Sequence, residues 1–293
     1  MAAGIKALTE AGLLGPLPGG VPPDGDVAAA FADRLREAVA RDELWLAYQP
    51  QADAHTGRLT GFEALVRWRL PDGTVVPPDV FVPMAEAGDG IHILGDWVLR
   101  RACETTAGWL RAGLADVPVA VNLSSRQLED PALARTVLGV LTETGLPAAN
   151  LKLELTETVL FQGGDTARQS LLELRGAGVR LVLDDFGTGY SSLALLRKVP
   201  VEALKIDKHF VEAMVEDRDA AAIVHAIVAL AHALGLQVIA EGVETAEQLL
   251  FLRAYRCDRI QGYHFSRPLA AVDVPDFISR NMKIGNAGTP PAG

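Results

Sequence analysis

The chain has 293 residues, of which 49% are hydrophobic and 22% charged, a composition typical of globular proteins. Its formal net charge of −10 at pH 7 disfavours binding to a nucleic-acid polymer, because like charges repel. No stretch reaches the about 18 uninterrupted apolar residues of a membrane segment, no secretory signal is recognisable, and Cys103 and Cys257 are isolated thiols, so we expect a cytoplasmic protein.

Glycine and proline divide the chain into one body and two terminal segments. Residues 15–25 read GPLPGGVPPDG, which breaks helices and strands, so the segment 1–27 is expected to be flexible. The tail 284–293 is rich in small residues and proline and is expected to be disordered. These segments leave a single predicted domain over residues 28–283.

Short apolar runs alternate with amphipathic segments inside this domain. The predicted strands are Leu44–Pro50, Phe62–Trp68, Val117–Leu123, Leu151–Thr156, Val179–Phe186, Ala203–Asp207, Leu236–Glu241 and Arg259–Tyr263. The predicted helices are Ile93–Ala112, Pro131–Thr144, Asp165–Ala177, Ala220–Leu234, Thr245–Ala254 and Val272–Asn281. Strands that alternate with helices in this way predict an α/β fold, a (β/α)8 TIM-like barrel.

The link between the first two predicted strands departs from this alternation. Residues 51–61 are rich in turn formers and too few for a crossover helix, so the two strands are predicted to pair as an antiparallel hairpin. The sequence therefore predicts a barrel with the first strand antiparallel.

Polar side chains stand at the carboxyl ends of the predicted strands, where barrels of this class carry their chemistry. They are Asn122, Glu154, Asp184, Asp185, Lys205, Asp207, Glu241 and Gln261, and Glu63 and Arg67 share one face of the second strand. Asn122 or Gln261 alone would be read as structural. The whole set cannot be explained in this way, because two like charges about 4 Å apart repel by roughly 4 kcal/mol. Carboxylates that converge therefore need raised pKa values or bound cations.

The candidate ligands are all oxygen atoms, which favours a hard cation such as Mg²⁺ or Mn²⁺ over zinc. The neighbours Asp184 and Asp185 suit a site with two ions, since one carboxylate can bridge while the other binds the second ion alone. Enzymes that hydrolyse phosphoesters by in-line attack commonly use two metal ions. The residues thus point to a metal-dependent phosphoesterase.

The stretch Glu63-Ala-Leu-Val-Arg67 resembles the signature of the EAL domain, the cyclic di-GMP-specific phosphodiesterase family. The resemblance covers nearly all of residues 31–281, and eight motifs in one order make it specific. The other motifs are Tyr48-Gln-Pro, Val121-Asn-Leu-Ser, Glu154-Leu-Thr-Glu, Asp184-Asp-Phe-Gly-Thr-Gly-Tyr-Ser-Ser, Leu204-Lys-Ile-Asp, Ile239-Ala-Glu-Gly-Val-Glu-Thr and Gln261-Gly-Tyr. The family fold is a barrel with its first strand antiparallel.

The resemblance implies a role for each matched residue. The metal ligands would be Glu63, Asn122, Glu154, Asp184, Asp185 and Glu241, with Asp184 bridging two ions. The catalytic set would be Glu63, Lys205, Glu241 and Gln261, in which Lys205 and Gln261 position the attacking water and Glu241 supports the second ion or acts as general base. The substrate would contact Gln49, Leu65 and Arg67. Glu157 and Asp207 would support the site, and Glu244 would anchor the loop after Gly187.

The implied reaction is hydrolysis of cyclic di-GMP to linear 5′-pGpG by two-metal in-line attack of a metal-bound water. Many members of the family are catalytically inactive cyclic di-GMP receptors or protein-interaction scaffolds, but the acidic set here is complete. The implied partners are cyclic di-GMP, a second copy in a homodimer and a possible regulatory protein. One departure from the family is Arg256, which stands where glycine is usual before Cys257.

Overall fold

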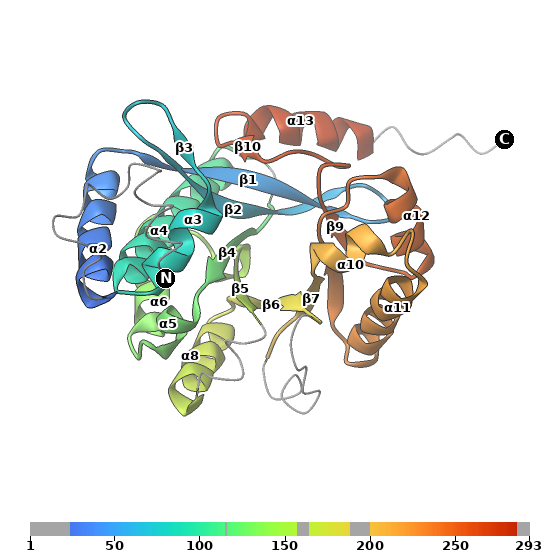
Figure 1. Cartoon of the computed structure of the whole chain (residues 1–293). Coiled ribbons are helices and arrows are strands. Elements are labelled where there is room, and N and C mark those ends of the chain that lie inside the picture. The colour runs from blue at the N-terminus through green and yellow to red at the C-terminus, as the bar shows by residue number, and fades with distance from the viewer. Residues whose placement is uncertain (1–23, 115, 157–163, 188–199, 286–293) are drawn as a thin grey trace.

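Eight strands close into a barrel in the computed structural model, which describes residues 24–114, 116–156, 164–187 and 200–285 (Figure 1). The barrel strands are β1 (Leu44–Asp53), β2 (Leu59–Arg69), β4 (Val119–Leu123), β5 (Leu151–Thr156), β6 (Arg180–Phe186), β7 (Ala203–Ile206), β8 (Gln237–Ala240) and β9 (Arg259–Gln261). Two short strands, β3 (Val75–Val76) and β10 (Leu269–Ala270), extend the sheet beside β2 and β1.

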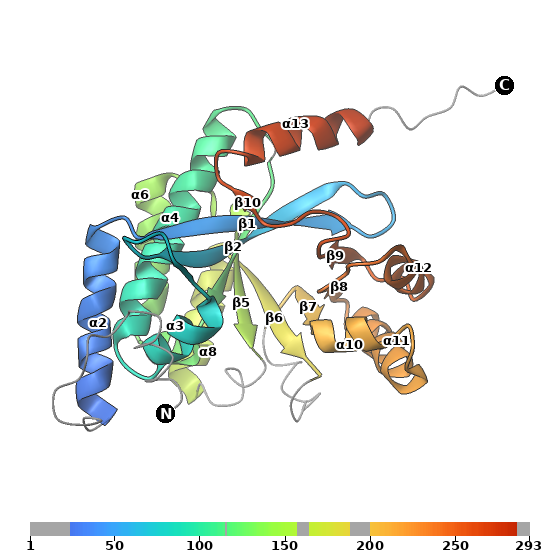
Figure 2. The same ribbon diagram turned by 45° about the horizontal axis from the view of Figure 1, so that its top comes forward.

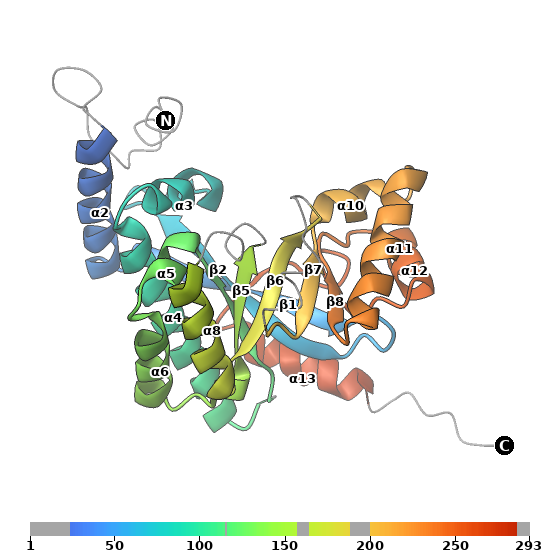
Figure 3. The same ribbon diagram turned by 90° about the horizontal axis from the view of Figure 1, so that it is seen from below.

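The first strand runs against both of its neighbours in the barrel. β1 pairs antiparallel with β2 and with β9, while β2 and β4 through β9 pair in parallel around the rest of the circuit. The predicted hairpin is thus confirmed, and with it the TIM-like barrel with a reversed first strand. Seen from below, β5 to β8 lie between two groups of helices (Figure 3).

Helices cover the outside of the barrel. They are α2 (Asp24–Ala40), α3 (Pro78–Glu86), α4 (Gly90–Arg111), α5 (Ser125–Glu129), α6 (Leu133–Thr144), α8 (Gly164–Gly176), α10 (Lys208–Ala213), α11 (Arg218–Ala233), α12 (Ala246–Ala254) and α13 (Val274–Gly285), with a 3₁₀ turn at Ala148–Asn150. The six predicted helices are all present, with ends that differ by a few residues. The last of them, α13, crosses the outside of β1 and β10 (Figure 2).

The helix α2 was not predicted. It begins at Asp24, so it includes the last four residues of the segment 1–27 that was expected to be flexible. Its buried residues Val27, Phe31, Leu35 and Ala38 are spaced three or four apart, which places them on one helical face. Glu43, at the start of β1, accepts hydrogen bonds from Arg34 at 2.5 Å and from Trp68 at 3.0 Å and so ties α2 to the barrel.

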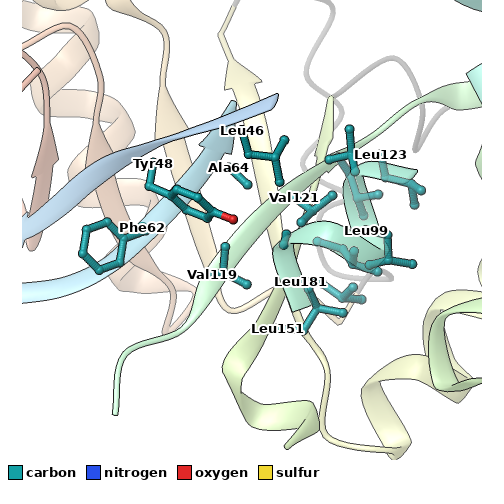
Figure 4. Close-up of a cluster of buried hydrophobic side chains, with 14 of the residues drawn as sticks. Leu46, Tyr48, Phe62, Ala64, Leu99, Val119, Val121, Leu123, Leu151 and Leu181 are labelled. Atoms are coloured by element: carbon teal, nitrogen blue, oxygen red, sulfur yellow. The ribbon is translucent and has the colours of Figure 1, made fainter. Parts of the chain in front are cut away.

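The main hydrophobic core lies between the outer faces of the strands and the helices. Figure 4 shows Leu99 of α4 among side chains of β4, β5 and β6, including Val121 and Leu181. Cys103 and Cys257 are both buried, and burial raises the pKa of each thiol to about 12, as expected for packing cysteines. Among the described residues, no helix is long and apolar enough to cross a membrane.

A second, small apolar cluster fills part of the barrel interior. Val182, Ala203 and Ile239 are fully buried and belong to no other cluster. Because side chains alternate along a strand, the residues two positions further on face the same interior at the next level. Those residues are Asp184, Lys205 and Glu241, so an aliphatic floor lies beneath them.

Candidate active site

Lys205 on β7 lies at the centre of a group of carboxylates. Its Nζ atom is 2.6 Å from Glu241, 2.7 Å from Glu154, 3.1 Å from Asp184 and 3.4 Å from Glu63. Burial alone would lower the pKa of Lys205, but these four carboxylates outweigh it and raise the pKa well above its usual range. The lysine is therefore a permanent positive charge inside the cluster.

The strand register brings these side chains to one level of the barrel. Asn122 of β4 lies directly opposite Glu154 of β5, and the end of β5 at Thr156 lies opposite Asp184 of β6. The adjacent strands run in parallel, so their carboxyl ends open at the same rim. The structure thus brings together all the residues predicted to bind metal, with Lys205 and Gln261 among them.

Glu63 on β2 is held by donors on both oxygens. Asn122 donates to its Oε1 at 2.7 Å, and Gln261 donates to its Oε2 at 2.5 Å. Burial raises the pKa of Glu63, but Lys205 and the two amides outweigh burial and leave the pKa lowered, so the carboxylate is ionised. Asn122 uses its amide nitrogen here, which leaves its Oδ1 as the atom suited to a cation.

Burial disfavours the ionised forms of Glu154 and Glu241. Burial raises the pKa of Glu154 well above its usual range, and the charges of Glu63 and Asp184 add to this effect. Burial likewise raises the pKa of Glu241 to about 8. The buried Oε1 of Glu154 has no hydrogen-bond partner among the described residues. A bound cation would favour the ionised form of both carboxyl groups and would give the unpartnered oxygen a partner.

Asp184 and Asp185 lie near the end of β6, where the backbone is irregular. The pairing register of β6 with β7 shifts between Leu183 and Phe186, and Asp185 has a φ angle of 53°, in the left-handed region. Burial, together with the neighbouring charges of Asp184 and Asp207, raises the pKa of Asp185 to about 6. The bend matters because adjacent residues of a regular strand point to opposite faces.

The carboxylates of Asp184, Asp185 and Glu241 could hold a metal ion. Each offers one oxygen, and the three atoms lie within 4.8 Å of one another. With Glu63, Asn122 and Glu154 alongside, the donor set consists of oxygen atoms only, which fits a hard divalent cation. The residues present therefore fit the expected metal ions, and Lys205 supplies positive charge between the two groups of ligands.

The predicted substrate residues lie beside this cluster on β1 and β2. Gln49 is opposite Glu63 in the hairpin and donates to the backbone oxygen of Ser266 at 2.8 Å. Leu65 and Arg67 follow Glu63 on the same face of β2 and are partly exposed. Four residues of strand span about 13 Å, so Arg67 lies well out from the metal ligands along the barrel wall.

A close backbone contact positions Gln261 at the end of β9. The Val243 N–H donates to the Gln261 carbonyl at 3.1 Å, and the His264 N–H donates to the Val243 carbonyl at 2.9 Å. Gly262 permits this approach, since a Cβ there would lie 2.2 Å from the Val243 oxygen. The segment that follows Glu241 is thereby fixed against Gln261.

Of the three residues predicted to support the site, the structure describes Asp207 and Glu244 but not Glu157. Asp207 caps α10 by accepting from the His209 N–H at 2.8 Å, and it also lies against Asp185. Glu244 is exposed, and its N–H donates to Gln248 at 2.7 Å. Glu157 and the loop 188–199 lie outside the described residues, so the anchoring of that loop by Glu244 stays a prediction.

Two buried residues of the site region were missed. Gln51 on β1 donates to Gln261 Oε1 at 3.0 Å, and Lys152 on β5 donates to Gln51 Oε1 at 3.2 Å. Gln51 follows Gln49 by two positions and Lys152 precedes Glu154 by two. The alternation of strand side chains was the signal that could have found both.

Comparison with known proteins places this geometry in a family. The model of the EAL domain matches residues 32–268. An uncharacterised signalling protein of Caulobacter vibrioides is 48% identical over 243 residues, which are 83% of this chain and 29% of that protein. The cyclic di-GMP phosphodiesterase NbdA of Pseudomonas aeruginosa is 44% identical over 246 residues, 84% of this chain and 31% of NbdA. The chain thus spans about a third of the length of these curated relatives.

Solved structures agree with the family match. The PaMucR phosphodiesterase in complex with c-di-GMP has 41% sequence identity and a TM-score of 0.79, covering 83% of this chain and 98% of that one. The EAL domain of Mycobacterium smegmatis DcpA has 37% identity and a TM-score of 0.70, covering 81% and 98% of the two chains.

Proposed function

Because this chain belongs to the EAL domain family, we propose that it is a phosphodiesterase that hydrolyses cyclic di-GMP to linear 5′-pGpG. The observation that carries the proposal is the rim of oxygen ligands around Lys205, in which one buried oxygen of Glu154 has no hydrogen-bond partner within the described part of the chain. The similarity to NbdA and to the c-di-GMP complex of PaMucR supports the choice of substrate.

The proposed cofactors are two divalent ions, Mg²⁺ or Mn²⁺. Glu63, Asn122, Glu154 and Asp184 would hold one ion, and Asp185 and Glu241 would hold the second together with Asp184. The chemistry that two such ions supply is the activation of water for in-line attack on phosphorus and the neutralisation of charge on the leaving 3′ oxygen. Carboxylates that repel one another in the metal-free chain would then become favourable ligands.

The chain's own side chains bind and orient the reactants. Arg67 would pair with a substrate phosphate, while Gln49 and Leu65 would line the nucleotide site. The ammonium of Lys205 is held in place by its ion pairs, and one of its three N–H groups would turn from a carboxylate to the attacking water. Glu241, whose carboxylate lies 2.6 Å from Lys205, would accept the proton of that water.

A turnover assay tests the proposal. The purified chain is incubated with cyclic di-GMP and either Mg²⁺ or Mn²⁺, and the products are separated by chromatography. Linear pGpG is expected, and it should disappear in Glu63→Gln, which keeps the shape of the side chain but removes its charge. Binding without turnover by the unaltered chain would refute the enzyme and favour a cyclic di-GMP receptor. Neither binding nor turnover would favour a protein-interaction scaffold.

The assembly is a separate part of the proposal. The resemblance to the family predicts a homodimer and allows a regulatory protein partner. Light scattering of the purified chain, with and without cyclic di-GMP, distinguishes a dimer from a monomer. A monomer at every protein concentration that supports turnover would refute the homodimer.

A further inference from the structure

A row of buried polar side chains runs through the barrel interior from Lys152 to Glu63. Lys152 Nζ donates to Gln51 Oε1 at 3.2 Å, Gln51 Nε2 donates to Gln261 Oε1 at 3.0 Å, and Gln261 Nε2 donates to Glu63 Oε2 at 2.5 Å. Lys152 and Gln51 are 0% exposed. The row therefore joins four strands, β5, β1, β9 and β2, and its end at Lys152 and Gln51 is out of contact with solvent.

The two ends of the row fix its direction. A lysine ammonium can only donate hydrogen bonds, and an ionised carboxylate can only accept them. Each glutamine amide has one donating and one accepting end, so the oxygen of Gln51 must face Lys152 and its nitrogen must face Gln261. The oxygen of Gln261 is then occupied by Gln51, and its nitrogen must face Glu63. Lys152 thus decides the orientation of an amide that it does not touch.

The position of Lys152 is hard to explain by stability alone. Within the described part of the chain, no carboxylate forms an ion pair with its ammonium, and burying a charge without such a partner is unfavourable. The absence of a side chain at position 61 nevertheless leaves room for the Lys152 ammonium. Gly61 lies beside the contact, and a Cβ there would be 3.3 Å from both Lys152 Nζ and Gln51 Oε1. A larger residue at position 61 would crowd the hydrogen bond between them.

We propose that Lys152 and Gln51 are positioning residues, which orient the amide of Gln261 so that it donates to Glu63 and holds that carboxylate in place for a divalent ion. This inference rests on the proposed function, because Glu63 matters here as a metal ligand. Groups that hydrogen-bond to metal ligands typically change metal affinity or activity by about 10- to 100-fold when they are altered. The amide of Gln261 is such a group, and Gln51 and Lys152 act through it.

The decisive variant is Gln51→Glu. It nearly preserves the shape of the side chain and still accepts from Lys152, but it cannot donate to Gln261. Gln261 then lies between two carboxylates that can only accept, and its single amide group can satisfy only one of them. We expect the Mn²⁺ affinity, measured by calorimetry, to fall by about 10- to 100-fold, and kcat to fall with little change in KM. Gln237→Glu, at an exposed position of β8, makes the same change of charge and should leave both unchanged.

A second variant separates positioning from packing. Gln51→Met removes both polar ends and leaves Lys152 without its acceptor, so it should lower the melting temperature of the metal-free chain more than Gln51→Glu does. It leaves Gln261 free to donate to Glu63, however, so it should reduce Mn²⁺ affinity less than Gln51→Glu does. The two variants are expected to rank in opposite order for stability and for metal affinity. The same order in both measurements would overturn the inference in favour of a purely structural role.

A measurement without metal keeps the inference distinct from the proposed function. The side-chain amide signals of Gln261 can be assigned by NMR from their loss in Gln261→Glu. In the metal-free chain they should shift in Gln51→Glu and stay in place in Gln237→Glu. Absence of Mn²⁺ binding and turnover in the unaltered chain would refute the proposed function alone, whereas unshifted Gln261 signals in Gln51→Glu would overturn the orientation mechanism.

Discussion

The carboxylates of Asp184 and Asp185 converge, although the two residues are neighbours on one strand. Their oxygens lie with one of Glu241 in a group no wider than 4.8 Å. The left-handed backbone of Asp185 and the shifted register of β6 make this possible. A backbone conformation that most residues avoid is therefore part of the candidate metal site.

This backbone predicts a difference between two substitutions of Asp185. Asparagine tolerates the left-handed region and alanine does not, so Asp185→Ala should have a lower free energy of unfolding than Asp185→Asn by about 1 kcal/mol in the absence of metal. Both variants lose the same charge and should lose most of the turnover. Urea unfolding with EDTA present measures the difference, and equal stability of the two variants would contradict the role given to the backbone.

Glu154 is predicted to be favourable for metal binding and unfavourable for the metal-free fold. Glu154→Gln removes a carboxyl group whose ionised form is disfavoured by burial, while Lys205 keeps three other carboxylates within 3.4 Å. We expect the metal-free variant to gain about 1 kcal/mol in free energy of unfolding. The unaltered chain should melt at a higher temperature when Mn²⁺ is added, and the variant should respond much less. A variant stabilised by Mn²⁺ as strongly as the unaltered chain would exclude Glu154 as a ligand.

Gly262 is predicted to be intolerant of any side chain. Gly262→Ala would place a Cβ 2.2 Å from the Val243 oxygen and 2.4 Å from the Val243 nitrogen, both backbone atoms. The two backbone segments that follow β8 and β9 must move apart, which should lower the free energy of unfolding by about 3 kcal/mol and reduce turnover by moving Gln261. Gly235→Ala is the control, because its φ of +73° is also positive but no atom lies within 4 Å of its Cβ. That control should lose only about 1 kcal/mol, and equal losses in the two variants would show that the contact with Val243 is unimportant.

Arg256 offers a stabilising substitution. It follows helix α12 with a φ of 65°, at a position where a helix commonly ends in glycine, and it is exposed. Arg256→Gly should raise the free energy of unfolding by about 1 kcal/mol, because glycine adopts this conformation without strain. Arg256→Ala keeps the strain and should bring no such gain. Thermal or urea unfolding of the two variants checks the expectation, and turnover should be unchanged in both.

The barrel could be predicted from the sequence because its signals are local. Apolar runs marked the eight strands, and the short link between β1 and β2 was enough to predict that the first strand is reversed. The strands β3 and β10 have two residues each, too few for any periodicity. The helix α2 has a clear apolar pattern at Val27, Phe31 and Leu35, but it follows directly on a Gly- and Pro-rich stretch that is typical of a linker.

The candidate site was predictable in composition and less so in geometry. Residues at the ends of strands could be assigned to one rim because parallel strands share that rim. The alternation of strand side chains could have placed Gln51 and Lys152 in the barrel interior, but their contacts depend on the register between strands distant in sequence. The bend at Asp185 depends in the same way on the register between β6 and β7. Gln51 lies opposite Gln261 only because the last barrel strand, β9, pairs with the first, β1, and so closes the barrel.

The aliphatic floor beneath the acidic rim has a consequence for the traffic of reactants. Val182, Ala203 and Ile239 are each 0% exposed, so the barrel interior at their level is closed to solvent. In the proposed reaction the linear dinucleotide must leave by the opening through which the cyclic one arrived. Product that stays bound at the rim therefore blocks binding of the next substrate. Release of the product is thus a step that can limit the rate of turnover.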